Sequence, residues 1–222
     1  RTHTPSATTT PARRRTPWRR ATAWLATALA GALLVAPLAG AQSASDFQGA
    51  PNIDLSSTDG ATITEAGTYV LTGSLSNGSV VVRAPGAAVT LVLDGVDIAN
   101  SSGPAILFED VAEAAVVLAE GSSNVLTDGG ASEFDAALYS AASLTIAGGG
   151  ALEVHATYEG ISSTMHITIA GGTLRVYAEE NGINANNDGV RQIAVTGGYL
   201  YIETETGDAI DSNGTITVSG GT

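Results

Sequence analysis

The chain has 222 residues, of which 27 are glycine and none is cysteine. Its nine basic residues are all arginines, six of them within the first twenty positions, and they face 22 acidic residues. A chain this acidic lacks the cationic patches that nucleic acids and anionic lipid surfaces require, and without cysteine it forms no disulfide bonds.

The first 41 residues have the features of a secretory signal peptide. Arginine clusters at 13–15 and 19–20 precede an apolar run over residues 21–38, which ends in the small residues 39–41. This run is too short and too poorly flanked for a stable membrane span. We therefore expect cleavage after Ala41 and a secreted protein, exported by the Sec route rather than the twin-arginine route.

Removing the signal peptide makes the protein strongly acidic. Residues 42–222 keep all 22 acidic side chains and only the arginines at 83, 175 and 191, which gives a net charge of −19. Nucleic acid is therefore not expected as a partner, whereas cations are favoured.

The predicted elements of the remaining chain are short strands. Residues 42–60 are rich in Ser, Asp and Asn and are interpreted as a linker. Runs rich in Val, Ile, Leu and Thr then alternate with Gly, Pro, Asn and Asp, which predicts strands at 69–72, 79–83, 89–93, 96–98, 105–108 and 114–118. The alanines of 109–120 also fit a helix, but the Val-Val-Leu run followed by a turn sequence favours a strand.

A repeat organises the second half of the chain. Glycine pairs begin at Gly148, Gly171, Gly197 and Gly220, with spacings of 23, 26 and 23 residues. No segment has the periodicity of a long helix, and apolar residues alternate with polar ones on each side of the glycine pairs. The sequence predicts an all-β, right-handed parallel β-helix of about seven coils over residues 61–222, incomplete at its C-terminal end. An antiparallel β-sandwich is the alternative, but it does not explain the repeat.

Aligning the repeats predicts which residues lie beside one another. With Leu138, Ile161, Ile183 and Ile210 as equivalent positions, the next column holds Tyr139, Ser162, Asn184 and Asp211. Carboxylates and amides thus gather at one turn, where neighbouring coils lie about 4.8 Å apart. A hard cation removes the repulsion between such groups, and Ca²⁺ takes six to eight oxygen ligands. We expect Ca²⁺ between the last coils, with the ligands Glu180, Asn184, Asp188, Asp208 and Asp211; stacked turn residues without a metal are the alternative.

The second strand of each repeat predicts another surface. One outward column holds Glu153, Arg175 and Tyr201, and the next holds His155, Tyr177 and Glu203. Exposed tyrosines stack on sugar rings, while Glu, Arg and His bind hydroxyl groups. The candidate carbohydrate-binding residues are His155, Arg175, Tyr177, Tyr199 and Tyr201; ordinary cross-strand pairing is the alternative.

The order of motifs resembles a known family. GTYVLTGSLSNGSVVVRAP, LVLDGVDIANSSGPAILF, LAEGSSNVLTDGG and GDAIDSNGTITVSGGT look like the bacterial secreted carbohydrate-binding domain-containing proteins. The resemblance implies a pectate-lyase-like right-handed parallel β-helix that binds Ca²⁺ at its turns and plant cell-wall polysaccharides, including acidic ones. The family's acidic turn is complete here only at Asp208 and Asp211.

We therefore expect a secreted, non-catalytic polysaccharide-binding protein whose binding depends on Ca²⁺. Two alternatives remain open: a β-helix lyase or glycosidase, and a surface adhesin or spacer module. A lyase needs a basic group beside the metal, for which Arg175 and Arg191 are the candidates, and a glycosidase needs two carboxylates across a cleft.

Overall fold

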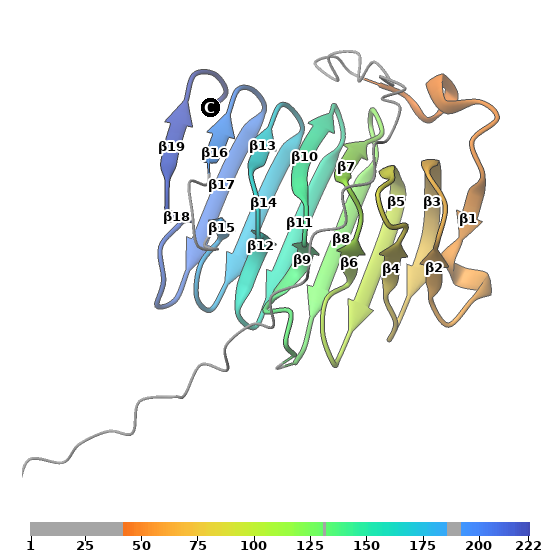
Figure 1. The fold of residues 1–222 in the computed structure, drawn as a ribbon, viewed down its shortest axis with the longest axis horizontal. Helices are drawn as coiled ribbons and strands as arrows, with labels where there is room; N and C mark the ends of the chain where they lie inside the picture. Colours follow the sequence, from red (N-terminus) through yellow and green to blue (C-terminus); the bar gives the residue numbers. More distant parts are fainter. Residues whose placement is uncertain (1–41, 131, 186–191) are drawn as a thin grey trace, which may run out of the picture. The chain divides into compact units, whose positions relative to one another are not determined.

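The chain winds into stacked coils of parallel β-strands (Figure 1). The structure, a computed structural model, describes residues 42–130, 132–185 and 192–222. Every strand pair among these residues is parallel, so the sandwich alternative is wrong. The architecture is a right-handed parallel β-helix, as the repeat predicts.

Each coil runs through three faces, and one separate sheet forms the first of them. This first face holds seven strands among the described residues: β2 (Ala61–Ile63), β4 (Val80–Arg83), β6 (Ile106–Asp110), β9 (Ala136–Ser140), β12 (Glu159–Ser163), β15 (Ile183–Ala185) and β18 (Ile210–Ser212). The chain makes six full turns from β2 to β18 and begins a seventh, which agrees with the repeat length.

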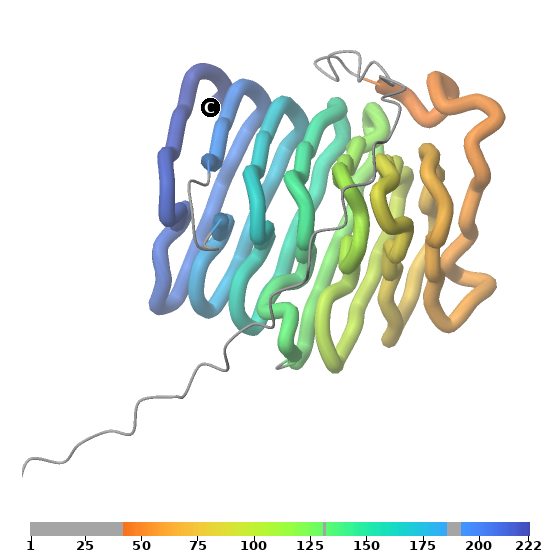
Figure 2. The backbone as a smooth tube through the Cα atoms, viewed as in Figure 1, coloured from red at the N-terminus to blue at the C-terminus, as the bar shows by residue number. Residues whose placement is uncertain are grey.

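The other two faces belong to one continuous sheet, because β3 (Gly67–Leu75) and β5 (Ala88–Asn100) bend from one face into the other. The second face continues with β7 (Glu113–Leu118), β10 (Ser143–Gly148), β13 (Ile167–Ile169), β16 (Gln192–Val195) and β19 (Thr215–Val218). The third face continues with β8 (Ser123–Asp128), β11 (Ala151–Ala156), β14 (Thr173–Ala178) and β17 (Tyr199–Thr204). Figure 2 traces this winding along the backbone.

Glycines form the corner between the second and third faces. Gly148, Gly172 and Gly198 have φ angles of 103°, 87° and 84°, a region that side chains disfavour. At Gly148 a Cβ atom would also collide with the backbone carbonyl of Leu118 on the preceding coil. The paired glycines therefore mark the bends, as the sequence indicates.

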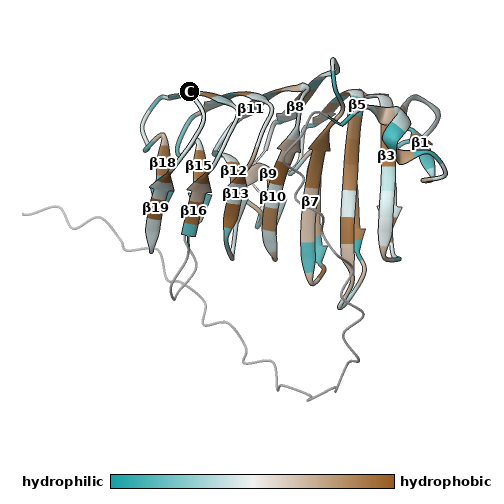
Figure 3. Cartoon of the chain, turned by 90° about the horizontal axis from the view of Figure 1, so that it is seen from above, coloured by the Kyte–Doolittle hydropathy of each residue, from teal (hydrophilic) through white to brown (hydrophobic). Residues whose placement is uncertain are grey.

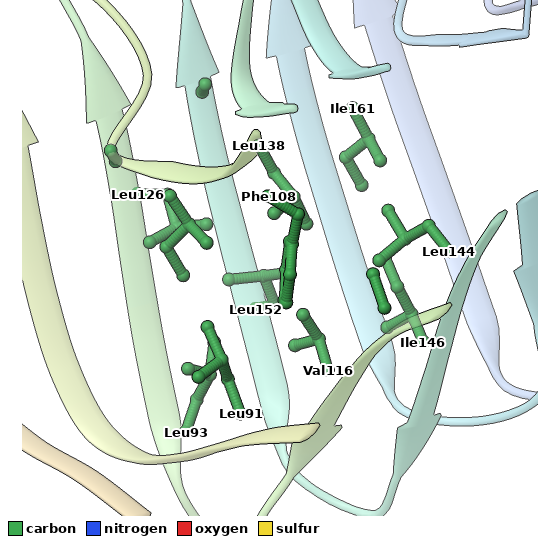
Figure 4. Packing of buried hydrophobic residues seen from close by; sticks show 14 of the residues in the cluster. Leu91, Leu93, Phe108, Val116, Leu126, Leu138, Leu144, Ile146, Leu152 and Ile161 are labelled. Carbon is green, nitrogen blue, oxygen red and sulfur yellow. The ribbon is translucent and has the colours of Figure 1, made fainter. Parts of the chain in front are cut away.

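The interior is one continuous apolar stack. Leu138, Ile161 and Ile183 are fully buried and pair in register from coil to coil. Figure 4 shows Phe108, Leu138 and Leu152 directed into the same space from different strands. Hydrophobic residues concentrate in the strands, as the colouring of Figure 3 shows. Burial of these alternating residues fixes which side chains of each strand point outward.

The segment predicted as a linker, residues 42–60, packs on the first coil instead. It contains the 3-10 helices η1 (Ala44–Phe47) and η2 (Leu55–Ser57), and β1 (Asn52–Asp54) pairs with β3. Leu55 is fully buried in the core, and Phe47 packs against an apolar cluster that includes Val70 and Val92. Burial of these few apolar residues outweighs the polar composition on which the linker interpretation rests. None of the helices in the described part of the chain has the length and apolar character that a membrane span requires.

Candidate functional site

The third face presents an ordered set of side chains outward. Leu174 and Val176 of β14 are fully buried, so the alternation of the strand turns Arg175 and Tyr177 away from the core. In β17 the same alternation leaves Tyr199 and Tyr201 each 42% exposed. The local sequence thus decides that the polar and aromatic residues share one outer surface.

The strand registers bring the predicted columns together. Arg175 pairs with Glu153 on one side and with Tyr201 on the other. Tyr177 pairs in the same way with His155 and Glu203. The two predicted columns are therefore confirmed. The register continues without a shift across β11, β14 and β17.

Three rings form a row across β11, β14 and β17. The ring of His155 stacks on that of Tyr177 with centroids 5.2 Å apart and planes inclined by 10°. Tyr177 in turn meets Tyr201 at 6.0 Å with an inclination of 56°. These separations lie in the range of favourable aromatic pairs, so the rings hold one another in place.

A cationic group lies beside this row. The guanidinium carbon of Arg175 is 5.9 Å from the centroid of the Tyr199 ring, which is a cation–π contact. The structure records no ion pair of Arg175 with a described residue, whereas Arg83 binds Glu109 at 2.7 Å. From here on, the name aromatic row covers the three rings of His155, Tyr177 and Tyr201 together with Arg175 and Tyr199. The structure brings these five predicted residues together on one face.

Two carboxylates of the same strands fix the ends of the row. Glu153 Oε1 lies 2.8 Å from His155 Nε2, and the Tyr201 hydroxyl donates to Glu203 Oε2 over 2.9 Å. The hydrogen bond to Glu203 raises the pKa of Tyr201, and the charge of that carboxylate raises it further. Tyr201 therefore stays a neutral donor at the surface.

The first face carries the polar residues from which the metal site is predicted. Tyr139 pairs with Ser162, Ser162 with Asn184, and Asn184 with Asp211, as the alignment of the repeats predicts. Asn184 is fully buried, Asp211 is half-buried, and Glu180 and Asp208 are exposed. The remaining predicted ligand, Asp188, lies outside the described residues.

Glu159 also lies at this position, although it is not among the five predicted ligands. It is only 8% exposed and accepts a hydrogen bond from the side-chain amide of Asn184. Burial raises the pKa of the Glu159 carboxyl, although hydrogen bonds from Ser162 and Asn184 partly oppose the shift. The aligned repeats contain a sign of this role, because Glu159 stands two residues before Ile161, at the position equivalent to Asp208.

Asn184 also has an unsatisfied oxygen. Its Oδ1 atom is buried and has no hydrogen-bond partner among the described residues. Across the described ranges, no three His, Cys, Asp or Glu residues gather as a metal site. Oxygen ligands at this position would therefore come from Glu159 and from amides, and the set of five predicted ligands stays a prediction.

The stacked coils define a solenoid whose third face displays aromatic and polar side chains outward. Residues 57–222 match the family described as carbohydrate-binding domain-containing protein, and the chain belongs to this family. This confirms the resemblance that the sequence motifs indicate.

Two known proteins are similar to the chain. A carbohydrate-binding domain-containing protein from Acetivibrio thermocellus is 34% identical over 126 residues, which cover 52% of this chain and 44% of that relative. The chain thus matches less than half the length of that protein. A polysaccharide lyase-like protein from C. thermocellum, solved as a gadolinium derivative, is 23% identical with a TM-score of 0.56, over 73% of this chain and 89% of the other. The latter likeness concerns the fold.

Proposed function

We propose that this protein is a secreted, non-catalytic polysaccharide-binding protein and that the aromatic row is its binding surface. The observation that carries the proposal is the contiguous arrangement of Tyr177, Tyr201 and Arg175 on one outer face. Tyrosine rings offer apolar faces to the C–H groups of sugars, while the flanking polar groups bind hydroxyls. Family membership supports polysaccharide as the ligand.

Arg175 favours an acidic polysaccharide. Arg175 has no carboxylate partner in the described ranges, and a guanidinium in that state binds a sugar carboxylate through two parallel hydrogen bonds. The ring of Tyr199 beneath it holds the guanidinium in place. The negative charge of the rest of the chain opposes such a ligand, so Arg175 determines whether an acidic chain is accepted at all.

The carboxylates at the row are placed to orient their neighbours rather than to perform hydrolysis. Glu153 is bound to His155, and Glu203 is bound to Tyr201. A glycosidase pair must instead flank the bond to be cleaved, with one acid held protonated. A lyase needs a basic group, for which Arg175 and Arg191 are the candidates. Arg175 packs on Tyr199, and Arg191 lies outside the described residues.

Calcium is proposed as a structural partner on the first face. Glu159 and Asn184 fit it best, because the buried Oδ1 of Asn184 lacks a partner within the part of the chain that the structure describes, and Asp211 follows on the next strand. Bound Ca²⁺ would neutralise the negative charge there. Burial raises the pKa of Tyr139, and the nearby carboxylates of Glu159 and Asp135 raise it further.

Binding to polygalacturonate, measured by calorimetry, tests the proposal. Truncation of a central interface tyrosine commonly costs about 1–2 kcal/mol, so Tyr177→Ala should weaken binding roughly 5- to 30-fold. Arg175→Gln should weaken binding to polygalacturonate roughly tenfold, since it removes a charged hydrogen bond. Tyr158→Ala is the matched control, because Tyr158 is 37% exposed but lies in the turn after β11.

Two results would contradict the proposal. Equal losses in Tyr177→Ala and Tyr158→Ala would show that the row has no special part in binding. Release of unsaturated products from pectin by the wild type, abolished in Arg175→Gln, would make the protein a lyase. Repeating the titration with a chelator separates the role of Ca²⁺ from that of the row.

A further inference from the structure

The aromatic row contains a side chain whose charge depends on pH in the physiological range. Histidine ordinarily changes its charge between about pH 5 and pH 8. Residues 42–222 contain two histidines, His155 and His166. His155 belongs to β11 and to the row, whereas His166 is exposed between β12 and β13. A change of charge at His155 therefore acts on the proposed binding surface, and His166 provides a comparison.

Two contacts hold the imidazole of His155 in place. Its ring lies nearly parallel to that of Tyr177, with centroids 5.2 Å apart, and its Nε2 atom lies 2.8 Å from Glu153 Oε1. The carboxylate favours a proton on Nε2, which leaves Nδ1 of the neutral ring as an acceptor. Protonation keeps the contact with Glu153, adds a positive charge and turns Nδ1 into a donor. The side chain of His155 is 45% exposed, so solvent protons and a ligand both reach it.

The neighbours of His155 on the side of β8 carry no charge on the outer surface. The residues of β8 in register with Glu153 and His155 are Val125 and Thr127. The next residue, Asp128, is only 5% exposed and accepts hydrogen bonds at the turn after β11. The β8 side of the row therefore neither attracts nor repels a charged ligand directly.

The side of β14 and β17 carries the charges. Arg175 is in register with Glu153, and Tyr177 is in register with His155. One strand further, Glu203 is in register with Tyr177. While His155 is neutral, the outer charges of these registered positions are two carboxylates and one guanidinium, which leaves a negative excess. Protonation of His155 balances it.

Two buried carboxyl groups near β11 also respond to pH. Burial raises the pKa of Asp128 and that of Glu159. Asp128 is turned inward from β8, and Glu159 lies on the first face beside Tyr139, whose pKa burial also raises. Because these three groups are displayed on other sides of the coil, their titration does not change the charge of the row itself.

We propose that protonation of His155 strengthens the binding of an acidic polysaccharide, so the aromatic row holds its ligand more tightly in mildly acidic surroundings. This inference rests on the proposed function. A sugar carboxylate bound to Arg175 is repelled by Glu153 while His155 is neutral. Protonated His155 offsets that repulsion and offers the ligand a further donor at Nδ1. Carboxyl groups ordinarily ionise at about pH 4, so the ligand keeps its charge throughout.

Calorimetric titration with hexagalacturonate at about pH 7.5 and about pH 5.5 tests the inference. The wild type should bind about three- to tenfold more tightly at the lower pH, because one unit charge a few Å from a carboxylate in water has an effect of about this size. His155→Gln stays polar without titrating and should lose the difference. His166→Gln is the matched control and should keep it. The difference should also shrink as salt is added.

Two further measurements do not depend on the affinity of the His155 variant. At about pH 6.5, wild-type titrations in two buffers of different ionisation enthalpy should show that binding takes up protons. Glu153→Gln removes the repelling carboxylate and should tighten binding at about pH 7.5. Unchanged or weaker binding by Glu153→Gln at that pH would count against the repulsion on which the inference depends.

The outcomes separate this inference from the proposed function. Equal wild-type affinities at the two pH values, or a difference that His155→Gln retains, would overturn the role of His155 and leave hexagalacturonate binding intact. Absence of hexagalacturonate binding at both pH values would overturn the acidic ligand of the proposed function, and the inference with it.

Discussion

Ile161 offers a quantitative test of the stacked interior. It is fully buried and pairs with Leu138 and Ile183 on the two neighbouring coils. Ile161→Ala removes three carbon groups, which costs about 2.4 kcal/mol of transfer free energy at about 0.8 kcal/mol per group. Because the coils on both sides hold the site open, the residual cavity raises the expected loss of unfolding free energy to about 3–4 kcal/mol.

Ile216 is the matched control, since it is the same residue type but 47% exposed. Ile216→Ala leaves no enclosed cavity and should lower the unfolding free energy by only about 1 kcal/mol. Urea unfolding followed by circular dichroism measures both, and with a slope of about 2–3 kcal/mol/M the midpoints should fall by about 1–2 M and about 0.4 M. Equal midpoints for the two variants would refute the packing argument.

Two further changes probe the polar and glycine positions. Because burial raises the Glu159 pKa above 4.5, folding binds a proton there and wild-type stability falls as pH rises through that window. In the presence of a chelator, the melting temperature of Glu159→Gln should therefore exceed that of the wild type at about pH 7 but not at about pH 4. The same difference at both pH values would contradict this reasoning. Added Ca²⁺ should reverse the gain. Gly148→Ala should lower the unfolding free energy by about 2 kcal/mol or more, through backbone strain and collision of the new Cβ atom with Leu118. Gly86→Ala is the control, because Gly86 also has a positive φ but a Cβ atom there meets no other atom, and it should cost about 1 kcal/mol. Similar losses in the two variants would exclude the collision.

The sequence predicts neighbours well where the repeat is regular. Alternation decides which residues of a strand face outward, and the glycine pairs set the register from coil to coil. Those two rules are sufficient to place Arg175 between Glu153 and Tyr201, as the structure confirms. Stacking then follows from spacing alone, because parallel strands lie about 4.8 Å apart.

Contacts that cross the columns are harder to predict. Glu159 reaches Asn184 diagonally, from a position three residues earlier in the repeat, and register does not tell in which direction a side chain leans. The packing of Leu55 and Phe47 depends on single apolar residues in a polar segment, too few to form a pattern. In β5 the strand continues through Gly95, with a φ of 77°, where the sequence indicates two separate strands.

The regular spacing of the third face gives the proposed binding surface a unit of length. Neighbouring coils are about 4.8 Å apart, close to the length of one sugar residue along a polysaccharide. A ligand that runs across the strands therefore meets one coil per sugar. Duplication of a single repeat in the gene would lengthen the bound oligosaccharide by one residue without new chemistry, and deletion would shorten it. The strand spacing in this fold thus lets ligand length evolve in discrete steps.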